Sequence, residues 1–431
     1  LYAAESLGLN YEFIAVQDTL LLRHVMVGNA EDANGYLLYP DGAPRFRVIY
    51  TNGGDAGRHG LALTDTGRQR IRDFFRHGGS YTGSCAGAYL ASLSNADRGV
   101  EPSFYHLWPG RTKNTNIYNA YVGNFIPESS ALLRYHHFGG DFYIDSLYLN
   151  SGPFANESLD WPSGTEVLLR YDTTGSRAHN KASAWAWKAH DSTGRIAVVG
   201  THPEGWSFGE RLRLMKAVLQ YALDGVGAAR VKGMLVNGVP REMNRPTGAD
   251  PAFVKIGDRQ YHHFTFDLPP GARGLDVTLD ADDSFHLNLY LRRDSFAFRS
   301  RAEFTDTAAG ADKRITVAVP QPGRWFVGVE CATTVETYGD SIFLYRGRTD
   351  VLNGVGYTIT ASWSSGITEA VSATFPALKA TVVRGLFVVP DEVGVTVLDA
   401  AGRRVAKGGL APGVYFLKQG EAAPQRLVVT R

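Results

Sequence analysis

The sequence predicts an α/β domain with a doubly wound parallel sheet in residues 1–229, followed by two all-β sandwich domains in residues 230–366 and 367–431. Up to about residue 227, short apolar runs alternate with segments of helical periodicity, which indicates a parallel sheet covered on both faces. From about residue 230 onward the helical periodicity disappears, and short alternating runs between Gly- and Pro-rich turns indicate antiparallel sheets. The chain of 431 residues also exceeds what one hydrophobic core usually supports.

The first residues have the pattern of a helix over 1–9 and of a strand over 11–16, with no strand before them. A doubly wound sheet normally opens with an interior strand. We therefore expect either that the sequence lacks this first strand or that another chain supplies it.

Two strand and helix pairs carry the α/β prediction. Residues 46–50 form an apolar run that ends at the turn residues Asn52-Gly53-Gly54, and the helix that Thr64 begins places Ile71, Phe74 and Phe75 on one face. A second strand is predicted over residues 196–200, and the apolar spacing of residues 209–223 predicts a second helix.

The remaining half of the chain predicts strands only. Residues 231–250 are rich in Gly, Pro and Asn, and we expect a linker or an excursion of the chain there. The second region then has strand patterns over residues 261–266, 287–291, 325–329 and 357–360. The third region repeats this arrangement on a smaller scale, with strand patterns over residues 393–398, 413–417 and 426–430.

Charge and composition exclude some partners. The formal net charge is +1, which gives no reason to expect nucleic acid or an anionic membrane as a partner. No apolar stretch approaches the roughly 20 residues that span a bilayer, so no membrane span is expected. The two cysteines, Cys85 and Cys331, are too few for a disulfide scaffold and lie in different predicted domains, so we expect no bond between them.

The stretch around Cys85 carries the most chemical information. Gly83 and Gly87 flank the cysteine two residues away on each side, as in a tight strand-to-helix turn that is too crowded for a Cβ atom at those positions. The following helix would direct its N-terminal amides at the thiolate and favour ionisation. On its own this pattern is a weak signal, because most free cysteines are buried structural residues.

A second motif strengthens the interpretation of Cys85 as a nucleophile. His202 and Glu204 lie two residues apart, immediately after the strand predicted over residues 196–200. In a parallel sheet, this loop and the turn at Cys85 emerge at the same edge. A thiol nucleophile needs an imidazole to exchange its proton, and a carboxylate that orients the imidazole.

Three motifs together resemble the biotin-protein ligase N-terminal-like branch of the class I glutamine amidotransferase-like superfamily. They are, in order, Asn52-Gly53-Gly54-Asp55, Cys85-Ala86-Gly87-Ala88-Tyr89 and His202-Pro203-Glu204. The resemblance covers about the first half of the chain and implies a flavodoxin-like fold. It also implies that Cys85 is the nucleophile, His202 the base and Glu204 its orienting group. The oxyanion hole would then come from Gly53, Gly54 and the amide of Ala86.

The second and third regions also resemble known domains. Residues 282–291 and 322–327 are similar to bacterial pre-peptidase C-terminal domains, which accompany secreted hydrolases and imply an extracellular setting. Residues 397–405 and 410–417 are similar to the C-terminal sorting domain of type IX secretion cargo. Together these resemblances imply an extracellular or cell-surface location.

We expect neither a metal nor another cofactor. His136 and His137 are adjacent, but no Asp, Glu or Cys lies at ligand spacing from them. Asp282 and Asp283 offer carboxylates of the kind that calcium binds, although acidic loop residues are usually only solvated.

These observations predict a secreted or surface cysteine hydrolase of the amidase or peptidase type, acting on the C–N bond of a small amide or peptide. The alternative is a non-catalytic extracellular structural or adhesive protein built on an amidotransferase-like fold. The apparent lack of a first strand is consistent with this alternative, because homo-oligomers or strand-exchanging assemblies could complete the sheet. The two hypotheses differ in whether His202 lies within reach of Cys85.

Overall fold

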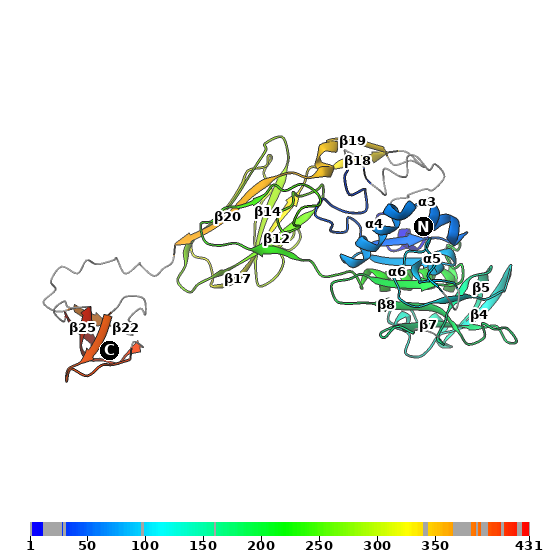
Figure 1. The fold of residues 1–431 in the computed structure, drawn as a ribbon, viewed down its shortest axis with the longest axis horizontal. Coiled ribbons are helices and arrows are strands. Elements are labelled where there is room, and N and C mark those ends of the chain that lie inside the picture. The colour runs from blue at the N-terminus through cyan, green and yellow to red at the C-terminus, as the bar shows by residue number, and fades with distance from the viewer. Residues whose placement is uncertain are drawn as a thin grey trace. The chain divides into compact units, whose positions relative to one another are not determined.

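The computed structural model describes residues 2–11, 28, 32–95, 99–158, 161–338, 344–364, 381–384, 387–388, 395–406, 409–419 and 425–430. The chain divides into two compact units, Leu1–Ser364 and Ser365–Arg431. It is mostly β, with several separate sheets and few helices (Figure 1). Within the described residues, no helix combines the length and the apolar character that a membrane crossing requires.

The N-terminal sheet is mixed, not fully parallel as predicted. Its parallel part consists of β1 (Val48–Thr51), β2 (Ser80–Ser84) and β9 (Arg195–Val199), hydrogen-bonded in that order. The sheet continues antiparallel through β8 (Ala182–Lys188), β7 (Glu166–Asp172), β4 (Ala120–Phe125) and β5 (Tyr143–Leu149). The short strands β3 (Thr112–Asn114) and β6 (Pro153–Ala155) pair with each other beside β8.

The physical reason for the antiparallel half is the absence of crossover helices. Parallel neighbours need a crossover of a dozen or more residues, usually a helix. Between β3 and β8 the described residues contain only two short 3-10 turns, η1 (Ala131–Arg134) and η2 (Phe138–Gly140). Only β1, β2 and β9, with their helices, therefore correspond to the doubly wound parallel sheet that the sequence predicts.

Helices lie beside the parallel strands (Figure 1). They are α1 (Tyr2–Ser6), α3 (Ala56–Ala62), α4 (Thr64–Arg76), α5 (Ala86–Ala91) and α6 (Gly209–Leu223). As the spacing predicts, Ile71, Phe74 and Phe75 of α4 are buried, and they join one core cluster with Tyr81. Of the strand predicted over residues 11–16, all but Tyr11 lies outside the described residues.

The second part of the first unit is a β-sandwich. One sheet has the order β10 (Val231–Met234), β12 (Tyr261–Leu268), β17 (Gly323–Cys331), β14 (Leu287–Arg293) and β15 (Phe304–Asp306). The other has the order β11 (Arg241–Met243), β20 (Tyr357–Ser364), β13 (Arg273–Ala281) and β16 (Lys313–Val317). Alternate side chains of both sheets, among them Phe264, Leu289, Trp325 and Ile359, fill one hydrophobic core. The hairpin of β18 (Val335–Tyr338) and β19 (Leu344–Gly347) is separate from both sheets.

The prediction of a linker over residues 231–250 is wrong, because the segment forms strands of the sandwich. This segment supplies β10 and β11, the first strand of each sandwich sheet. Both strands are very short, and glycine and proline lie within or next to them. Glycine and proline are typical of turns when only neighbouring residues are considered. The strands that pair with β10 and β11 lie far away in the sequence, so the local pattern did not indicate them.

The second unit contains a small sheet of β21 (Thr381–Arg384), β26 (Gln425–Thr430), β25 (Gly413–Gln419) and β23 (Val395–Asp399). A separate pair joins β22 (Phe387–Val388) to β24 (Gly409–Leu410). Val397, Leu410, Leu427 and Val429 form its buried cluster. A core of this size makes only a marginally stable domain.

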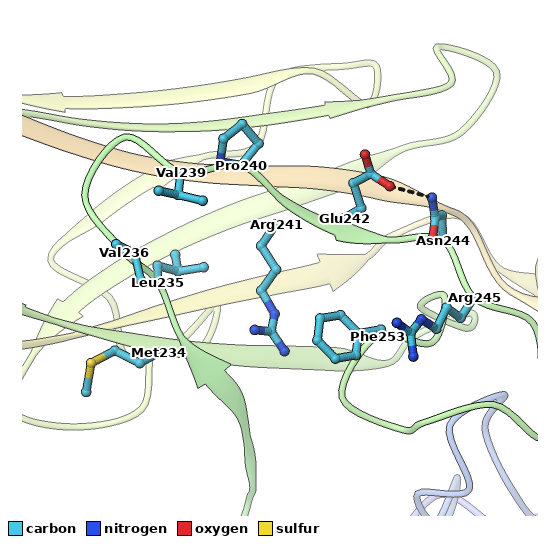
Figure 2. Close-up of a pocket in the computed structure, with 10 residues that line it drawn as sticks. All are labelled: Met234, Leu235, Val236, Val239, Pro240, Arg241, Glu242, Asn244, Arg245 and Phe253. Carbon is cyan, nitrogen blue, oxygen red and sulfur yellow. Dashed lines mark hydrogen bonds between the residues drawn. The ribbon is translucent and has the colours of Figure 1, made fainter.

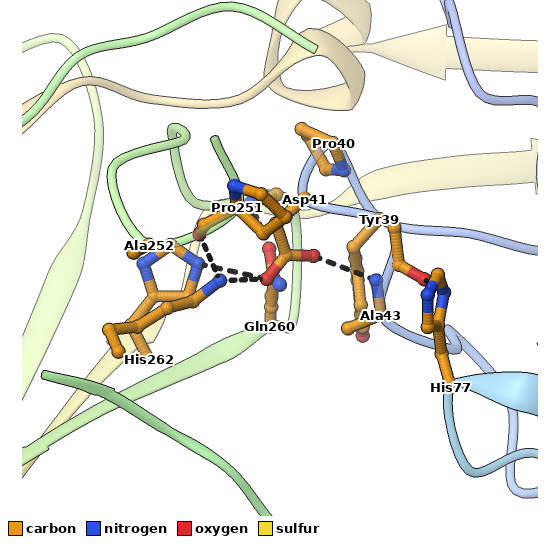
Figure 3. Close-up of polar contacts among 12 residues, drawn as sticks. Tyr39, Pro40, Asp41, Ala43, His77, Pro251, Ala252, Gln260 and His262 are labelled. Carbon is orange, nitrogen blue, oxygen red and sulfur yellow. Dashed lines mark hydrogen bonds and ion pairs between the residues drawn. The ribbon is translucent and has the colours of Figure 1, made fainter. Parts of the chain in front are cut away.

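A buried ionic cluster joins the two halves of the first unit (Figure 3). The carboxylate of Asp41, which precedes β1, pairs with the ammonium of Lys232 in β10. His262 of β12 lies 3.6 Å from the same carboxylate through Nε2, and its Nδ1 is 2.8 Å from the hydroxyl of Tyr357. Burial acts to raise the pKa of Asp41, but His262 and Lys232 together hold it well below its usual value.

Replacing Asp41 with alanine should destabilise the first unit, because Lys232 would keep a buried charge without its partner. Both side chains of this pair are nearly covered, 4% exposed for Asp41 and 13% for Lys232. We expect a loss of about 3 kcal/mol in the free energy of unfolding, measured by urea denaturation. The matched control is Asp267→Ala, which breaks the half-exposed pair with Arg324 and should cost less than about 1 kcal/mol. Equal losses for the two variants would contradict a structural role of the buried cluster.

Candidate active site

Cys85 occupies a sharp turn between β2 and α5. Its backbone is left-handed, with φ of 48°, which is strained for a residue with a side chain. The amide of Cys85 donates to the carbonyl oxygen of Val199 at 2.9 Å, so the turn is fixed to the neighbouring parallel strand β9. Strain that the surrounding structure enforces in this way is concentrated at functional sites in proteins.

The glycines that flank Cys85 are required by close packing. A Cβ atom on Gly87 would lie 2.3 Å from the carbonyl oxygen of Thr51, and one on Gly83 would lie 2.8 Å from the Cα of Gly87. These distances are too short for real contacts with backbone atoms. The crowding that the sequence predicts at these two positions is therefore confirmed.

His202 and Glu204 follow β9 at the same edge of the sheet. His202 Nδ1 lies 2.9 Å from Glu204 Oε1, and the hydrogen bond places the proton on Nδ1. The backbone amide of His202 donates to the carbonyl oxygen of Tyr148 at 2.8 Å, and the two rings lie 5.6 Å apart. The backbone and side chain of the histidine are both held in place.

Both Cys85 and Glu204 influence the protonation of the His202 imidazole. Burial acts to lower the pKa of His202, but hydrogen bonding and charge from Cys85 and Glu204 outweigh it and raise the pKa to about 10. The thiol also donates to the carbonyl oxygen of Asn150, with 3.8 Å between Sγ and O. Cys85 is only 5% exposed, so the sulfur is nearly covered.

Gly53 and Gly54 lie next to the histidines of the candidate site. A Cβ atom on Gly53 would lie 2.1 Å from Cε1 of His202, so this glycine packs directly on the imidazole. Gly54 has φ of 142°, and a Cβ there would lie 2.8 Å from Nε2 of His59. The structure thus brings all three sequence motifs to one edge of the sheet, with Ala86 as the first residue of α5.

The raised pKa of His202 predicts a pH dependence of stability. Its ordinary value is 6.5 and its value in the folded chain is about 10, so the folded state binds this proton more tightly. The resulting contribution to stability is fully present below pH 6.5 and is lost as the pH rises through 10. We expect the difference in unfolding free energy between wild type and His202→Gln, measured in urea, to shrink across this range. A constant difference would contradict the assigned interactions.

The other candidate residues do not gather into a site. His136 packs its ring against Phe138 at 5.9 Å, and burial together with Lys216 and Arg213 lowers its pKa. Asp282 accepts a hydrogen bond from the amide of Ser284, as in an ordinary turn. In the part of the chain that the structure describes, no three His, Cys, Asp or Glu side chains are grouped as metal ligands. Cys85 and Cys331 are both free.

A surface pocket of about 340 Å³ lies in the sandwich and not at Cys85 (Figure 2). Arg241 of β11 stacks over the ring of Phe253 at 4.4 Å, and the exposed Met234, Val236 and Val239 form part of its wall. All of its lining residues except Phe253 come from the segment expected to be a linker, so no sequence signal pointed to it. At Cys85, the sequence reasoning missed Tyr148 and Asn150, because nothing local links residues 143–150 to the loop after β9.

Two family models match parts of the chain. Residues 46–97 match the family described as biotin-protein ligase, N terminal, and residues 260–330 match the bacterial pre-peptidase C-terminal domain. The first match includes Gly53, Gly54 and Cys85 but ends before His202. The chain therefore contains a stretch like the N-terminal part of biotin-protein ligases and, after it, a pre-peptidase C-terminal domain. These two resemblances are confirmed at this level.

Solved structures with similar parts include the pre-peptidase C-terminal domain of collagenase from Bacillus anthracis. It is 11% identical, and the alignment covers 32% of this chain and 100% of that chain, with a TM-score of 0.19. PliG from Aeromonas hydrophila, a periplasmic lysozyme inhibitor, is 14% identical over 32% of this chain and 100% of its own, with a TM-score of 0.19. None of the curated protein sequences matches the chain.

Proposed function

We propose that the N-terminal part of this chain is a cysteine hydrolase that cleaves an amide or peptide C–N bond, with Cys85, His202 and Glu204 as its catalytic residues. The single observation that carries the proposal is the position of His202. Its Nδ1 lies 2.9 Å from the Glu204 carboxylate, and hydrogen bonding and charge from Cys85 and Glu204 raise its pKa to about 10 in spite of burial. Such a constellation is the usual means of activating a thiol.

The proposed reaction has two steps. The thiolate of Cys85 attacks the carbonyl carbon and forms a C–S bond, and the electron pair moves onto the carbonyl oxygen. When the intermediate collapses, the C–N bond breaks and His202 gives its proton to the leaving amine. A water molecule, deprotonated by His202, then attacks the thioester and releases the carboxylic acid and the thiol. Glu204 keeps the imidazole oriented and stabilises its charged form.

Backbone amides would hold the developing negative charge on oxygen. Ala86 is the first residue of α5, where helix amides have no partner within the helix. Gly53 and Gly54 would provide the second side of this oxyanion hole, since Gly53 lies against His202 and Gly54 follows it directly in the chain. Amides that are fixed before the reaction lower its barrier, and removing one such donor typically costs about a hundredfold or more in rate.

We propose further that the protein is extracellular or periplasmic. The pre-peptidase C-terminal domain at residues 260–330 supports this, because such domains accompany secreted hydrolases. The resemblance of residues 397–405 and 410–417 to a type IX sorting domain supports a cell-surface or secreted destination. We also propose that the N-terminal domain has a flavodoxin-like fold, which the parallel strands β1, β2 and β9 and their helices support.

The test of the proposed activity is hydrolysis of a pool of N-acetylated peptide 4-nitroanilides by the full chain. Release of 4-nitroaniline that disappears on replacing Cys85 supports the hydrolase. Release that persists in a Cys85 variant would assign the activity to something else. No release from any member of the pool would favour the structural or adhesive alternative, and native polymers of the chain would then be expected.

A further inference from the structure

A row of aromatic rings leads away from the candidate active site. The ring of Tyr148 lies 5.6 Å from that of His202, and the ring of Tyr121 lies 5.5 Å from that of Tyr148. The guanidinium of Arg211 then lies over Tyr121 at 5.5 Å and over Trp206 at 3.9 Å. We call Tyr148, Tyr121, Trp206 and Arg211 the aromatic row.

Tyr121 of the aromatic row is exposed, the other three members are half-buried, and the row is built from separate elements. Tyr121 belongs to β4, Tyr148 to β5 and Arg211 to α6, so the tertiary fold assembles it. Tyr121 is 59% exposed, and Phe208, whose ring lies 5.7 Å from that of Trp206, is 67% exposed. Large rings that gather on a surface beside a reactive group are typical of a binding site.

Arg211, at the end of the aromatic row away from His202, has N–H donors available for a ligand. Among the described residues, its guanidinium has no hydrogen bond or ion pair, and stacking between two rings fixes the position of its plane. A guanidinium held in this way presents a fork of N–H groups that matches a carboxylate.

The spacing suits an extended peptide. Three contacts of 5.5 to 5.6 Å separate the ring of His202 from the guanidinium of Arg211. An extended chain advances about 3.3 Å per residue, so the path corresponds to at most roughly five residues. A peptide offers both the C–N bond that Cys85 would attack and a carboxylate within this reach, whereas a neutral glycan offers no carboxylate.

We propose that the substrate is an extended acidic peptide that lies across Tyr148 and Tyr121 and pairs an Asp or Glu side chain with Arg211. The proposal deepens the proposed function and rests on it for the position of the cleaved bond. In this proposal Arg211 determines specificity by recognising the negative charge. The ring of Tyr121 contacts both Arg211 and the peptide backbone.

The experiment uses the full chain and a positional library of acetylated decapeptide amides, with cleavage sites read by mass spectrometry. We expect Asp or Glu to be preferred over Gln by about fivefold at one position, at most roughly five residues from the cleaved bond. Arg211→Gln should remove this preference, and Arg211→Glu should replace it with a preference for Lys or Arg. Arg213→Gln, two residues further along α6 and outside the row, should keep it, because residues two apart point to different sides of a helix. Tyr121→Phe should also keep the preference, whereas Tyr121→Ala should weaken it.

A parallel binding measurement separates the two proposals. The Cys85→Ser variant is titrated with the same peptides and with a neutral N-acetylglucosamine hexamer. Binding of acidic peptides that depends on Arg211, without cleavage by the wild type, supports the aromatic row as a peptide site and overturns the hydrolase. Cleavage with no acidic preference, or with a preference that Arg211→Glu leaves unchanged, overturns the peptide proposal. Binding of the hexamer alone, or of neither ligand, overturns it as well.

Discussion

Replacing Cys85 with serine should abolish amide hydrolysis while leaving the fold intact. The hydroxyl is a much weaker nucleophile than a thiolate held beside an imidazolium, so we expect the rate to fall by at least about a thousandfold. The measurement is release of 4-nitroaniline from the N-acetylated peptide pool, with thermal unfolding as the check on folding. Serine is similar in size to cysteine and fits the left-handed turn of φ 48° as well as cysteine does.

The matched control for this substitution is Cys331→Ser. Cys331 is fully buried in β17 of the sandwich, and burial raises the pKa of its thiol. This variant should retain the wild-type rate, because Cys331 belongs to the sandwich core and not to the cluster around His202. A Cys331 variant as inactive as the Cys85 variant would show that loss of activity follows loss of structure. Full activity in the Cys85 variant would exclude this thiol as the nucleophile.

Replacing Gly53 with alanine should disable the site while leaving Cys85, His202 and Glu204 themselves unchanged. The added Cβ would lie 2.1 Å from Cε1 of His202, so the imidazole must move away from Cys85 and Glu204. Misplacement of a catalytic group by about 1 Å costs roughly a hundredfold in rate, and we expect a loss of at least this size. Alkylation of Cys85 by iodoacetamide should slow in parallel, since the thiol loses the imidazole that would accept its proton.

Gly57→Ala is the control for a glycine substitution in the same stretch. Gly57 lies in α3, where an added Cβ would meet only the carboxylate of Asp55, at an ordinary distance of 3.4 Å. Alanine also favours a helix over glycine, so this variant should be active and at least as stable as the wild type. If both substitutions reduce hydrolysis to the same extent, the contact between Gly53 and His202 is not responsible.

The sequence predicted the parallel part of the N-terminal sheet but not the rest. In residues 209–223, helical spacing of apolar side chains such as Met215 and Leu219 coincides with α6, because local periodicity reflects burial on one face. The antiparallel half of the sheet was not predicted, because a short apolar run does not show in which direction the neighbouring strand runs. The strands β3, β6, β10 and β11 have only three or four residues each, too few for any periodicity.

The residues of the candidate site likewise fall into those that the sequence predicted and those that it did not. Cys85, His202, Gly53 and Ala86 were predictable because each ends or follows a parallel strand, and the ends of such strands share an edge. Tyr148, Asn150 and the aromatic row were not, since they depend on where β4 and β5 fall relative to β9 and α6. The roles assigned to these residues in catalysis stay predictions.

The most direct measurement of the central claim is the relative rate at which iodoacetamide alkylates the two cysteines of the native chain, followed by mass spectrometry of the peptides. Cys85 is 5% exposed and Cys331 is 0% exposed, so burial alone would leave both thiols slow to react. If His202 activates Cys85, this cysteine should react far faster than Cys331 at neutral pH, and His202→Ala should remove most of the difference. Equal and slow labelling of both cysteines, unchanged by His202→Ala, would contradict a catalytic thiol at this turn.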